Sequence, residues 1–459
     1  MQKVCAVVLC AGDGKRMKSS RPKVMCEVLF KPMIHWITDA LREAGIDDLC
    51  LVCSDRSDEV QKAVPGVEIA IQYERRGTGH AVMQARDYLT RRRGGDCVVL
   101  CGDAPFLSAE VIERSYRHHK EGGNAMTVIT AELADPFGYG RIVRDSRTGL
   151  VRGIVEQADT DSATAPIREV NSGAYWFQID YLLDALGALT TDNRQGEYYL
   201  TDTVTYGARR GLPVGGFQAD PDVILGANDR AGLLRLNEVA RARTLQAALQ
   251  NGVEVLVSDG VIIGADVTVG PDTRILPGTI LRGRVKIGSG CTIGPNTLIE
   301  NSTVGDNTTV NACQVFDSEI GSSVRLGPFS YVRPGCKIKD NAKIGDFVEL
   351  KNTVIGERTS VAHLSYLGDA ELGQRINMGG GIIICNYDGK HKYRTVIEDD
   401  AFVGCNTNLV APVTVEAGAY VAAGSTITET VPAGSLSIAR ARQVNKEGWR
   451  GDPRGGSRE

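Results

Sequence analysis

The chain of 459 residues lacks the features that would direct it to a membrane or to nucleic acid. Its longest apolar stretch near the N-terminus, Val4 to Ala11, is too short to span a bilayer and lacks the charged start and cleavage pattern of a secretion signal. The formal net charge is -4, so no global basic field draws the protein to nucleic acid or anionic lipid. We therefore expect a cytoplasmic protein with no nucleic-acid or membrane partner.

A disulfide framework is also not expected. Twelve cysteines in a chain of this length do not make a disulfide scaffold, and without an export signal we expect reduced thiols. Cys50 and Cys53 have the C-x-x-C spacing, but they lie in a strand-like run with no second Cys or His pair nearby. We interpret this pair as structural rather than as a metal or redox site.

The most informative feature present is a six-residue repeat from Ile263 to Ile427. An aliphatic residue is usually followed by Gly, and a small or β-branched residue stands four places after the aliphatic one. Such a period predicts a solenoid of short strands, which bury a continuous core only by stacking. The repeat is interrupted around Gly368, around Gly379–Gly381 and from Tyr387 to Arg394, where insertions become loops that often carry binding groups.

The first half of the chain alternates strand-like and helix-like runs. This alternation predicts a largely parallel α/β sheet covered on both faces, with ligands at the carboxyl ends of its strands. The predicted strands are Val4–Leu9, Leu49–Cys53, Val67–Gln72, Cys97–Leu100 and Ala125–Thr130, and the predicted helices are His35–Ala44, His80–Thr90 and Ser108–Lys120.

A long helical pattern separates the two halves. From Asn228 to Gln250 apolar residues recur at helical spacing, and Asn251-Gly252 is a stop signal. We therefore predict an N-terminal domain at 1–227, a helical linker at 228–250 and a solenoid domain at 251–459. The last two dozen residues, rich in Gly, Arg and Glu, predict a partly disordered tail.

A glycine-rich turn directly after the first strand forms the first candidate site. Gly12 and Gly14 allow backbone N–H groups to approach a phosphate, and the terminus of a following helix would favour negative charge. A G-x-G sequence alone is often only a turn. Here Arg16 and Lys23 add two cations, which suit a triphosphate whose charge shifts toward the leaving oxygens during transfer.

Further polar residues follow later strands. The amide of Gln72, which is followed by Gly77-Thr78-Gly79-His80, offers one donor and one acceptor that could match the imide edge of a pyrimidine, although it does not separate uracil from thymine. Gly102-Asp103 ends the next strand, where a carboxylate is well placed to hold Mg²⁺ against phosphate oxygens.

These motifs, with Gly138–Arg141, Glu156, Asn171 and the run Gln195–Tyr199, resemble the sugar-nucleotide pyrophosphorylases. With the repeat attached, the chain from Val4 to Trp449 resembles the bacterial bifunctional N-acetylglucosamine-1-phosphate uridylyltransferase/glucosamine-1-phosphate N-acetyltransferases. The resemblance implies a Rossmann-like nucleotidyltransferase domain, a connecting helix and a left-handed parallel β-helix. It also implies a homotrimer whose acetyl-transfer sites lie between neighbouring prisms.

For the first site, the resemblance implies that Arg16 stabilises the transferring phosphoryl group and that Asp103 and Asn228 bind Mg²⁺. The nucleotide and sugar would be held by Leu9, Cys10, Ala11, Gly12, Lys23, Gln72, Gly77, Thr78, Gly102, Asp103, Gly140, Glu156, Asn171 and Asn228. The attacking sugar phosphate is already largely ionised near neutral pH, so no general base is needed. Such a site must place two anions in line and neutralise them.

The second candidate site lies where the segment 362–369 leaves the repeat. A lone His is more often structural, but Arg333 and Lys351 lie in neighbouring upstream coils and could form a two-cation seat for a sugar phosphate near His363. Acetyl transfer from a thioester to an amine needs a proton acceptor and donors for the developing oxyanion. An imidazole that titrates near neutrality suits the first of these needs.

For the second site, the resemblance implies that His363 is the general base. Glucosamine 1-phosphate would be bound by Arg333, Lys351, Tyr366 and Asn377, and acetyl-CoA by Gly380, Asn386, Tyr387, Cys405, Ala423 and Arg440. Cys405 stands where the family usually has Ser, and Gly380 where it usually has Ala. Both residues are small enough to admit the cofactor, although Cys405 lacks the good hydroxyl donor of Ser. Ile382-Ile383-Ile384 replaces a run that commonly contains Thr, which we interpret as altered packing.

The predicted function is the two-step synthesis of UDP-N-acetylglucosamine, which supplies peptidoglycan and lipopolysaccharide precursors. Acetyl-CoA acetylates glucosamine 1-phosphate, and UTP then gives uridylate to N-acetylglucosamine 1-phosphate with release of pyrophosphate. One alternative is a nucleotidylyltransferase whose solenoid serves only assembly, although such a solenoid would not require His363 with Arg333 and Lys351. Another is a non-catalytic scaffold, in which the charged groups of the first site would be lost, although Lys23 and Asp103 are both present.

Overall fold

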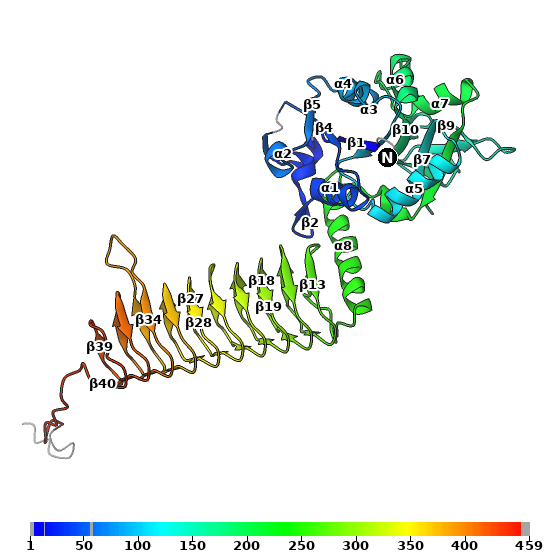
Figure 1. The fold of residues 1–459 in the computed structure, drawn as a ribbon. Helices are drawn as coiled ribbons and strands as arrows, with labels where there is room; N and C mark the ends of the chain where they lie inside the picture. Colours follow the sequence, from blue (N-terminus) through cyan, green and yellow to red (C-terminus); the bar gives the residue numbers. More distant parts are fainter. Residues whose placement is uncertain (1–3, 13, 56–57, 451–459) are drawn as a thin grey trace, which may run out of the picture. The chain divides into compact units, whose positions relative to one another are not determined.

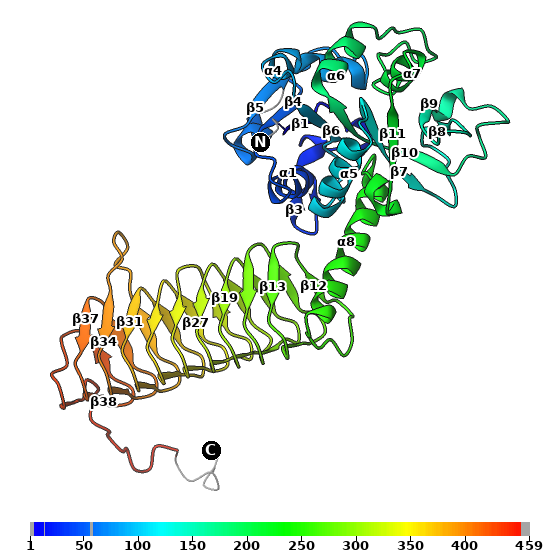
Figure 2. The ribbon, with the colours of Figure 1, turned by 45° about the vertical axis from the view of Figure 1, so that its right-hand side comes forward.

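The computed structural model describes residues 4–12, 14–55 and 58–450, which divide into two compact units, 1–240 and 241–459. Figures 1 and 2 show an α/β unit and a solenoid. Of the predicted disordered tail, residues 451–459 lie outside the described residues, and 438–450 form neither helix nor strand. Among the residues that the structure describes, no helix is both long and apolar enough to cross a bilayer.

The first unit is built on one mixed sheet with the strand order β11-β7-β10-β6-β1-β4-β5, to which the hairpin β8-β9 is attached through β10. The strands are β1 (Val4–Leu9), β2 (Glu27–Val28), β3 (Lys31–Pro32), β4 (Leu49–Cys53), β5 (Glu68–Ile71), β6 (Asp96–Cys101), β7 (Met126–Glu132), β8 (Arg141–Arg144), β9 (Val151–Val155), β10 (Glu169–Gln178) and β11 (Val214–Ala219). The helices are α1 (Met33–Glu43), α2 (Asp58–Ala63), α3 (Thr78–Gln84), α4 (Arg86–Thr90), α5 (Ala109–Glu121), α6 (Ile179–Gly187) and α7 (Asp202–Arg209), and the 3-10 helices are Lys15–Met17, Lys23–Met25, Gln157–Asp159 and Pro221–Ile224.

The predicted elements of this unit are present, with two corrections. The run predicted as one helix, His80–Thr90, forms two, because α3 ends at Gln84 and α4 begins at Arg86. The sheet is parallel through β6, β1, β4 and β5, but β10 lies antiparallel between β6 and β7. The sequence does not predict β10, because the first half of this strand, Glu169–Gly173, is polar and glycine-containing and carries no regular strand pattern.

Alternate residues of the central strands belong to two hydrophobic cores, one on each face of the sheet. From β1, Cys5 and Val7 pack with α3, α4, α6 and α7, whereas Ala6 and Val8 pack with α1 and α5. Burial on both faces explains why these strands are continuously apolar rather than alternating. Cys50 and Cys53 are buried within β4, and all twelve cysteines are free thiols.

A single helix, α8 (Arg230–Gln250), occupies the predicted linker region, and the division between the two units falls within it. In the second unit, Arg241 donates to the carbonyl of Val261 at 2.9 Å, and Thr244 donates to that of Ile263 at 2.8 Å. These bonds fix the C-terminal half of α8 to the first coil.

The second unit is the predicted left-handed parallel β-helix, whose coils contribute one strand to each of three parallel sheets. Face 1 contains β12 (Ile262–Ile263), β15 (Ile280–Arg282), β18 (Leu298–Glu300), β21 (Gln314–Phe316), β24 (Tyr331–Val332), β27 (Glu349–Lys351), β30 (Tyr366–Gly368), β33 (Ile383–Cys385), β36 (Asn408–Val410) and β39 (Thr426–Ile427). Face 2 contains β13 (Val267–Val269), β16 (Val285–Ile287), β19 (Thr303–Val304), β22 (Glu319–Ile320), β25 (Lys337–Ile338), β28 (Val354–Ile355), β31 (Ala370–Leu372), β34 (Thr395–Ile397) and β37 (Val413–Val415). Face 3 contains β14 (Arg274–Ile275), β17 (Thr292–Ile293), β20 (Thr309–Val310), β23 (Arg325–Leu326), β26 (Lys343–Ile344), β29 (Ser360–Val361), β32 (Asn377–Met378), β35 (Phe402–Val403), β38 (Tyr420–Val421) and β40 (Leu436–Ser437).

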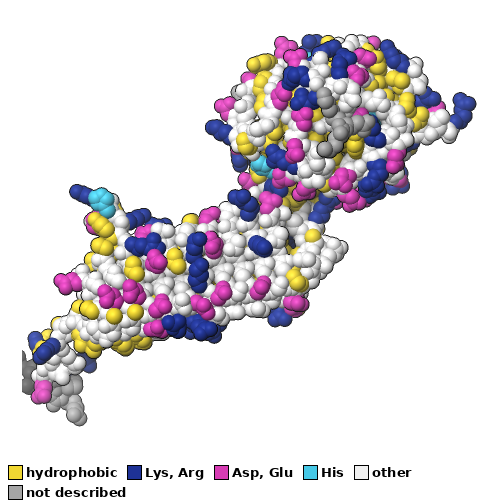
Figure 3. Space-filling model, viewed as in Figure 1, with side chains coloured by type: hydrophobic (Ala, Val, Ile, Leu, Met, Phe, Trp, Pro, Cys, Tyr) yellow, Lys and Arg dark blue, Asp and Glu magenta, His cyan; other side chains and the backbone are white. Residues whose placement is uncertain are grey.

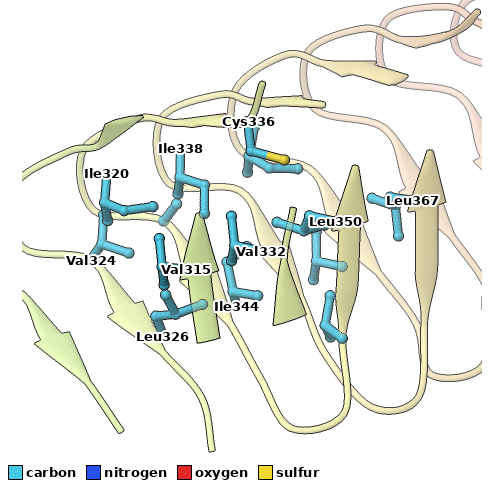
Figure 4. Close-up of a cluster of buried hydrophobic side chains, with 14 of the residues drawn as sticks. Val315, Ile320, Val324, Leu326, Val332, Cys336, Ile338, Ile344, Leu350 and Leu367 are labelled. Atoms are coloured by element: carbon cyan, nitrogen blue, oxygen red, sulfur yellow. The ribbon is translucent and has the colours of Figure 1, made fainter. Parts of the chain in front are cut away.

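The aliphatic residues of the repeat form the interior of the solenoid. Figure 4 shows Val332, Ile338 and Ile344, one from each face, pointing into a common core, and all three are at least 98 % buried. Each coil covers the apolar side chains of the next, so the core is continuous along the axis. On the surface shown in Figure 3, positive and negative side chains are interspersed.

One predicted interruption becomes a loop. The segment 386–394 joins β33 to β34 and projects beyond the coils in both ribbon views (Figures 1 and 2). Its base is closed by an antiparallel bridge between Tyr387 and Lys392. A projecting loop in a regular solenoid is available for binding, because its side chains are not needed to cover the core.

Two candidate active sites

A cavity of about 290 Å³ opens at the carboxyl ends of β1 and β6 in the first unit. It is lined by Leu9, Ala11, Gly12, Lys23, Val24, Gln72, Arg75, Gly77, Thr78, Ala81, Cys101, Asp103 and Glu197. Eight of these residues were predicted to hold the nucleotide, and the parallel strands gather them at one sheet edge. The other lining residues have no role predicted from the sequence, although Glu197 lies in the run Gln195–Tyr199 that carries part of the resemblance.

Lys23 lies at the centre of the polar side of this cavity. Its Nζ donates to a carboxylate oxygen of Asp103, and to Oδ1 of Asn228 at 2.9 Å. Backbone contacts also hold the segment before Asn228, because Ala227 N–H donates to the Asp103 carbonyl at 3.4 Å. The two oxygens predicted to bind Mg²⁺ therefore converge on one point. Gly102 lies beside them, where a Cβ atom would come within 2.9 Å of the Leu9 carbonyl.

The glycine-rich turn is present, but the predicted helix terminus after it is wrong. Gly14 has a φ of +56°, a backbone conformation in which a residue with a side chain would be strained. After this turn the chain forms only the three-residue 3-10 helix Lys15–Met17. So short a helix has too few aligned peptides for a useful dipole. Arg16 lies in this segment and is exposed to solvent. Asp13 lies outside the described residues.

The turn after β5 closes the opposite side of the cavity. Gln72 is 96 % buried, and its Nε2 lies 3.1 Å from Nδ1 of His80. Gly77 has a φ of +104°, and a Cβ atom there would lie 2.5 Å from the Tyr198 carbonyl oxygen. Thr78 accepts a hydrogen bond from the Leu200 N–H at 3.2 Å. The run 197–200 therefore packs directly on the start of α3.

A missed side chain, Arg75, ties this turn to the first strand. Its Nε donates to the Ala11 carbonyl at 2.9 Å, which spans the cavity between the two predicted binding segments. Cys10 is buried beneath the same edge. A single Arg after a strand gives no sequence signal of this contact, because the partner is a backbone carbonyl.

The three residues predicted to seat the sugar also come together. Asn171 N–H donates to the Gly140 carbonyl at 2.9 Å, and a Cβ atom on Gly140 would lie 3.3 Å from Oε2 of Glu156. A register shift in β10 between Asn171 and Tyr175 allows the Asn171 Nδ2 to reach the Tyr175 hydroxyl at 2.7 Å. Burial raises the pKa of Glu156, which a hydrogen bond from Thr201 at 3.2 Å partly opposes.

In the second unit, His363 lies at the edge between face 3 and face 1. Its φ is +59°, its side chain is 67 % exposed, and its Nδ1 lies 2.9 Å from Oδ1 of Asp346 in the preceding coil. The Gly381 N–H donates to the His363 carbonyl at 2.7 Å. The imidazole is therefore held outside the prism and is accessible to a substrate.

Face 1 carries most of the predicted sugar-phosphate residues on adjacent strands. Tyr366 pairs with Glu349, and Lys351 pairs with Gly368. Arg333, just beyond the preceding strand, contacts Glu349 at 3.0 Å. Lys351 has a lowered pKa, first because the Lys392 ammonium approaches it and then because of desolvation. Lys392, from the projecting loop, is thus a third cation that sequence reasoning missed.

Asn377 does not join this group within one chain. It lies on face 3, where it pairs with Ser360 and Phe402, and its side chain is exposed. The residues assigned to one substrate therefore occupy two faces of the prism.

The predicted acetyl-CoA residues divide in a similar way. Several of these residues pack against glycines of the neighbouring coils. A Cβ atom on Gly380 would lie 3.1 Å from Cβ of His363, and one on Gly379 would lie 2.9 Å from Sγ of Cys405. A Cβ atom on Gly404 would lie 2.5 Å from the backbone N of Ala423. Arg440 extends this row, since its Cδ would lie 3.7 Å from a Cβ on Gly424. Asn386 instead lies at the other end of face 1, where it donates to Asp369, and Tyr387 lies at the base of the projecting loop.

Comparisons with known proteins agree with both halves. Residues 5–221 match the nucleotidyl transferase family, residues 266–301 and 317–352 match the bacterial transferase hexapeptide family, and 394–429 match the hexapeptide repeat of succinyl-transferase. The bifunctional protein GlmU of Acetivibrio thermocellus is 47% identical over 98% of this chain and 97% of the relative. The protein of the same name from Halalkalibacterium halodurans is 46% identical over 96% and 97%, and that from Clostridioides difficile is 43% identical over 97% and 96%. The chain belongs to the GlmU family of bifunctional nucleotidyl- and acyltransferases.

Proposed function

We propose an allocation of residues for the two reactions of this bifunctional enzyme, which together synthesise UDP-N-acetylglucosamine for the cell wall. Acetyl transfer to glucosamine 1-phosphate takes place on the solenoid, and uridylyl transfer to the acetylated product takes place in the cavity of the first unit. The observation that carries this allocation is the presence of two different polar constellations in separate units, one around Lys23 and Asp103 and one around His363.

In uridylyl transfer, the cavity holds UTP between the glycine-rich turn and the turn after β5. The amide of Gln72 meets the base, Lys23 neutralises phosphate charge, and Arg16 approaches from the exposed side to stabilise the transferring group. Gly140, Glu156 and Asn171 seat N-acetylglucosamine 1-phosphate, whose phosphate oxygen attacks the α-phosphorus as pyrophosphate leaves. The chain positions two anions and supplies no general base.

Asp103 and Asn228 form a fitting pair of ligands for Mg²⁺. Both present oxygens toward the Lys23 Nζ, and Mg²⁺ takes oxygen ligands and few protein groups. Among the described residues there is no cluster of three or more His, Cys, Asp or Glu side chains, so the substrate phosphates would complete the coordination. When bound, the ion neutralises charge on the triphosphate.

In acetyl transfer, the cations of face 1 bind the phosphate of the sugar and His363 accepts the proton of its amine. Arg333 and Lys351 supply the cations, and Tyr366 lies between them and the edge that carries His363. Acetyl-CoA lies along the row of small residues that includes Gly380, Cys405 and Ala423; Gly380 is half-buried, and Cys405 and Ala423 are exposed.

A homotrimer is part of the proposal, and the division of the site between faces supports it. Asn377 lies on face 3, whereas the cations lie on face 1, and in the proposed trimer the Asn377 that contacts the substrate belongs to a neighbouring copy. A cytoplasmic location is also part of the proposal, and the twelve free thiols agree with a reducing compartment. An engineered monomer should keep uridylyl transfer and lose acetyl transfer, whereas equal loss of both activities would contradict the shared site.

The activities are tested by two assays on the purified full chain. Acetyl-CoA with glucosamine 1-phosphate should release free thiol, and UTP with N-acetylglucosamine 1-phosphate should release pyrophosphate only when Mg²⁺ is present. A panel of nucleoside triphosphates then fixes the base preference. Absence of thiol release would leave an enzyme with one activity, and absence of pyrophosphate release would refute the assignment of the cavity.

A further inference from the structure

The carboxylate of Asp346 contacts the imidazole of His363 from the preceding coil. Asp346 lies in the turn between β26 and β27, and its Oδ1 is 2.9 Å from Nδ1 of His363. Both side chains face solvent at the same edge of the prism, with 37 % of the Asp346 side chain exposed. Glu349, the carboxylate of the following strand, pairs with Arg333 instead. Asp346 is therefore the carboxylate that the structure places on the imidazole.

We propose that Asp346 is a positioning residue for acetyl transfer, in addition to the proposed role of His363 on which this inference rests. A carboxylate accepts only from a protonated nitrogen, so the contact keeps a hydrogen on Nδ1 and leaves the lone pair of Nε2 free. Nε2 is then the atom that can accept a proton. A carboxylate on the far nitrogen also stabilises the imidazolium that forms, as in hydrolytic triads.

The step balances with the groups already described. The amine nitrogen of glucosamine 1-phosphate forms a bond to the thioester carbonyl carbon, and its proton passes to Nε2 of His363. The carbon–sulfur bond breaks, and the thiolate of CoA leaves with that electron pair. The imidazolium returns its proton to the thiolate, so His363 begins and ends neutral and Asp346 stays ionised throughout.

The backbone holds both partners independently of the carboxylate. The Leu364 N–H donates to the Asp346 carbonyl at 3.2 Å, and the Gly381 N–H donates to the His363 carbonyl at 2.7 Å. Removal of the Asp346 side chain leaves these bonds in place. A substitution therefore changes the orientation and electrostatics of the imidazole while the coil keeps its path.

The test compares Asp346→Ala and Asp346→Asn in the full chain, with kcat and KM for glucosamine 1-phosphate measured separately. We expect Asp346→Ala to lower kcat by about 10- to 100-fold, with little change in KM. This is the loss that follows when a residue hydrogen-bonded to a metal-binding histidine is mutated. Asp346→Asn keeps an acceptor oxygen of the same shape and should recover part of the lost kcat. Glu357→Ala removes one carboxylate from another edge of the His363 coil and should leave kcat unchanged.

A double-mutant cycle separates this role from a structural one. If Asp346 acts through the imidazole, Asp346→Ala should cause no further loss in a His363→Ala background. A wild-type kcat in Asp346→Ala, or an additional loss without His363, would overturn the inference while the role of His363 stands. Full acetyl transfer by His363→Ala alone would instead refute the proposed general base.

Discussion

The two candidate sites differ in how the fold assembles them. The cavity of the first unit is concave and is built from segments as far apart in sequence as Leu9 and Asn228, which the sheet and the segment before α8 bring to one edge. The site on the solenoid is on an outer surface, and its members are neighbours because one coil lies on the next. Asp346 and His363 illustrate this, since equivalent turns of consecutive coils place them side by side.

The two sites also differ in how far water screens their charges. The first site is enclosed by one chain, so charges within it are only partly screened and a cation such as Lys23 acts strongly on a phosphate. His363 is two-thirds exposed, and an exposed ion pair is weak. A second surface must therefore exclude water for the solenoid to catalyse well, which is the physical reason for the proposed trimer.

The largest expected effect tests whether the two sites are independent. His363→Ala should lower acetyl transfer by about 10²- to 10⁴-fold, the usual contribution of a general base, and leave uridylyl transfer unchanged. Thiol release and pyrophosphate release, measured on the same preparation, check this. His118→Ala, which removes an exposed histidine from α5, serves as the control. A parallel fall in both activities would show that the units are coupled.

The enclosed site should be more sensitive to an added methyl group. Gly77→Ala places a Cβ atom 2.5 Å from the Tyr198 carbonyl oxygen, so the run 197–200 must move away from the cavity. We expect kcat/KM for UTP to fall by at least about tenfold, because a misplacement of about 1 Å can cost as much as about 10²-fold.

The matched control for this substitution is Gly66→Ala. Gly66 also has a positive φ, +79°, but a Cβ atom there meets no atom within 4 Å. Both variants carry left-handed strain, and only Gly77→Ala disturbs the cavity. Equal losses of uridylyl transfer in the two variants would show that strain, rather than the contact with Tyr198, is responsible.

The sequence predicts local patterns well and long-range contacts poorly. The six-residue period predicts the solenoid because each coil repeats one local rule, and apolar runs such as Val4–Leu9 predict strands buried on both faces. The helix terminus after Gly14 was predicted wrongly, because a turn sequence does not reveal how many residues continue as helix. Lys392 was missed because its position depends on the path of the projecting loop.

A smaller effect concerns the burial of Glu156. Its pKa is raised by burial, so the fold favours the neutral carboxyl, and stability is lost as the pH rises through the pKa of the folded state. Glu156→Gln should therefore raise the melting temperature of the first unit more at pH 8 than at pH 4. A gain of about 2–4 °C corresponds to 1 kcal/mol in a domain of this size.

The same substitution should reduce uridylyl transfer, because the carboxylate is proposed to bind the sugar. Glu113→Gln on α5 changes an exposed carboxylate in the same unit and is the control for both measurements. If Glu156→Gln raises the melting temperature equally at pH 4 and pH 8, burial of the ionised carboxylate is not what destabilises the wild-type protein.

The smallest expected effect is on the open site, where solvent screens the charges. The Lys392 ammonium lowers the pKa of Lys351, so Lys351 loses its charge, and its attraction for a phosphate, at a lower pH than an isolated lysine. In Lys392→Gln, Lys351 should stay charged to a higher pH, and the alkaline rise in KM for glucosamine 1-phosphate should move upward. Near neutrality the lost cation should change KM by less than about fivefold, since exposed charges contribute little.

The control is Lys390→Gln, on the same loop, which should not move the alkaline rise in KM. If both variants move it equally, the general field of the loop is responsible and Lys392 has no specific contact with Lys351.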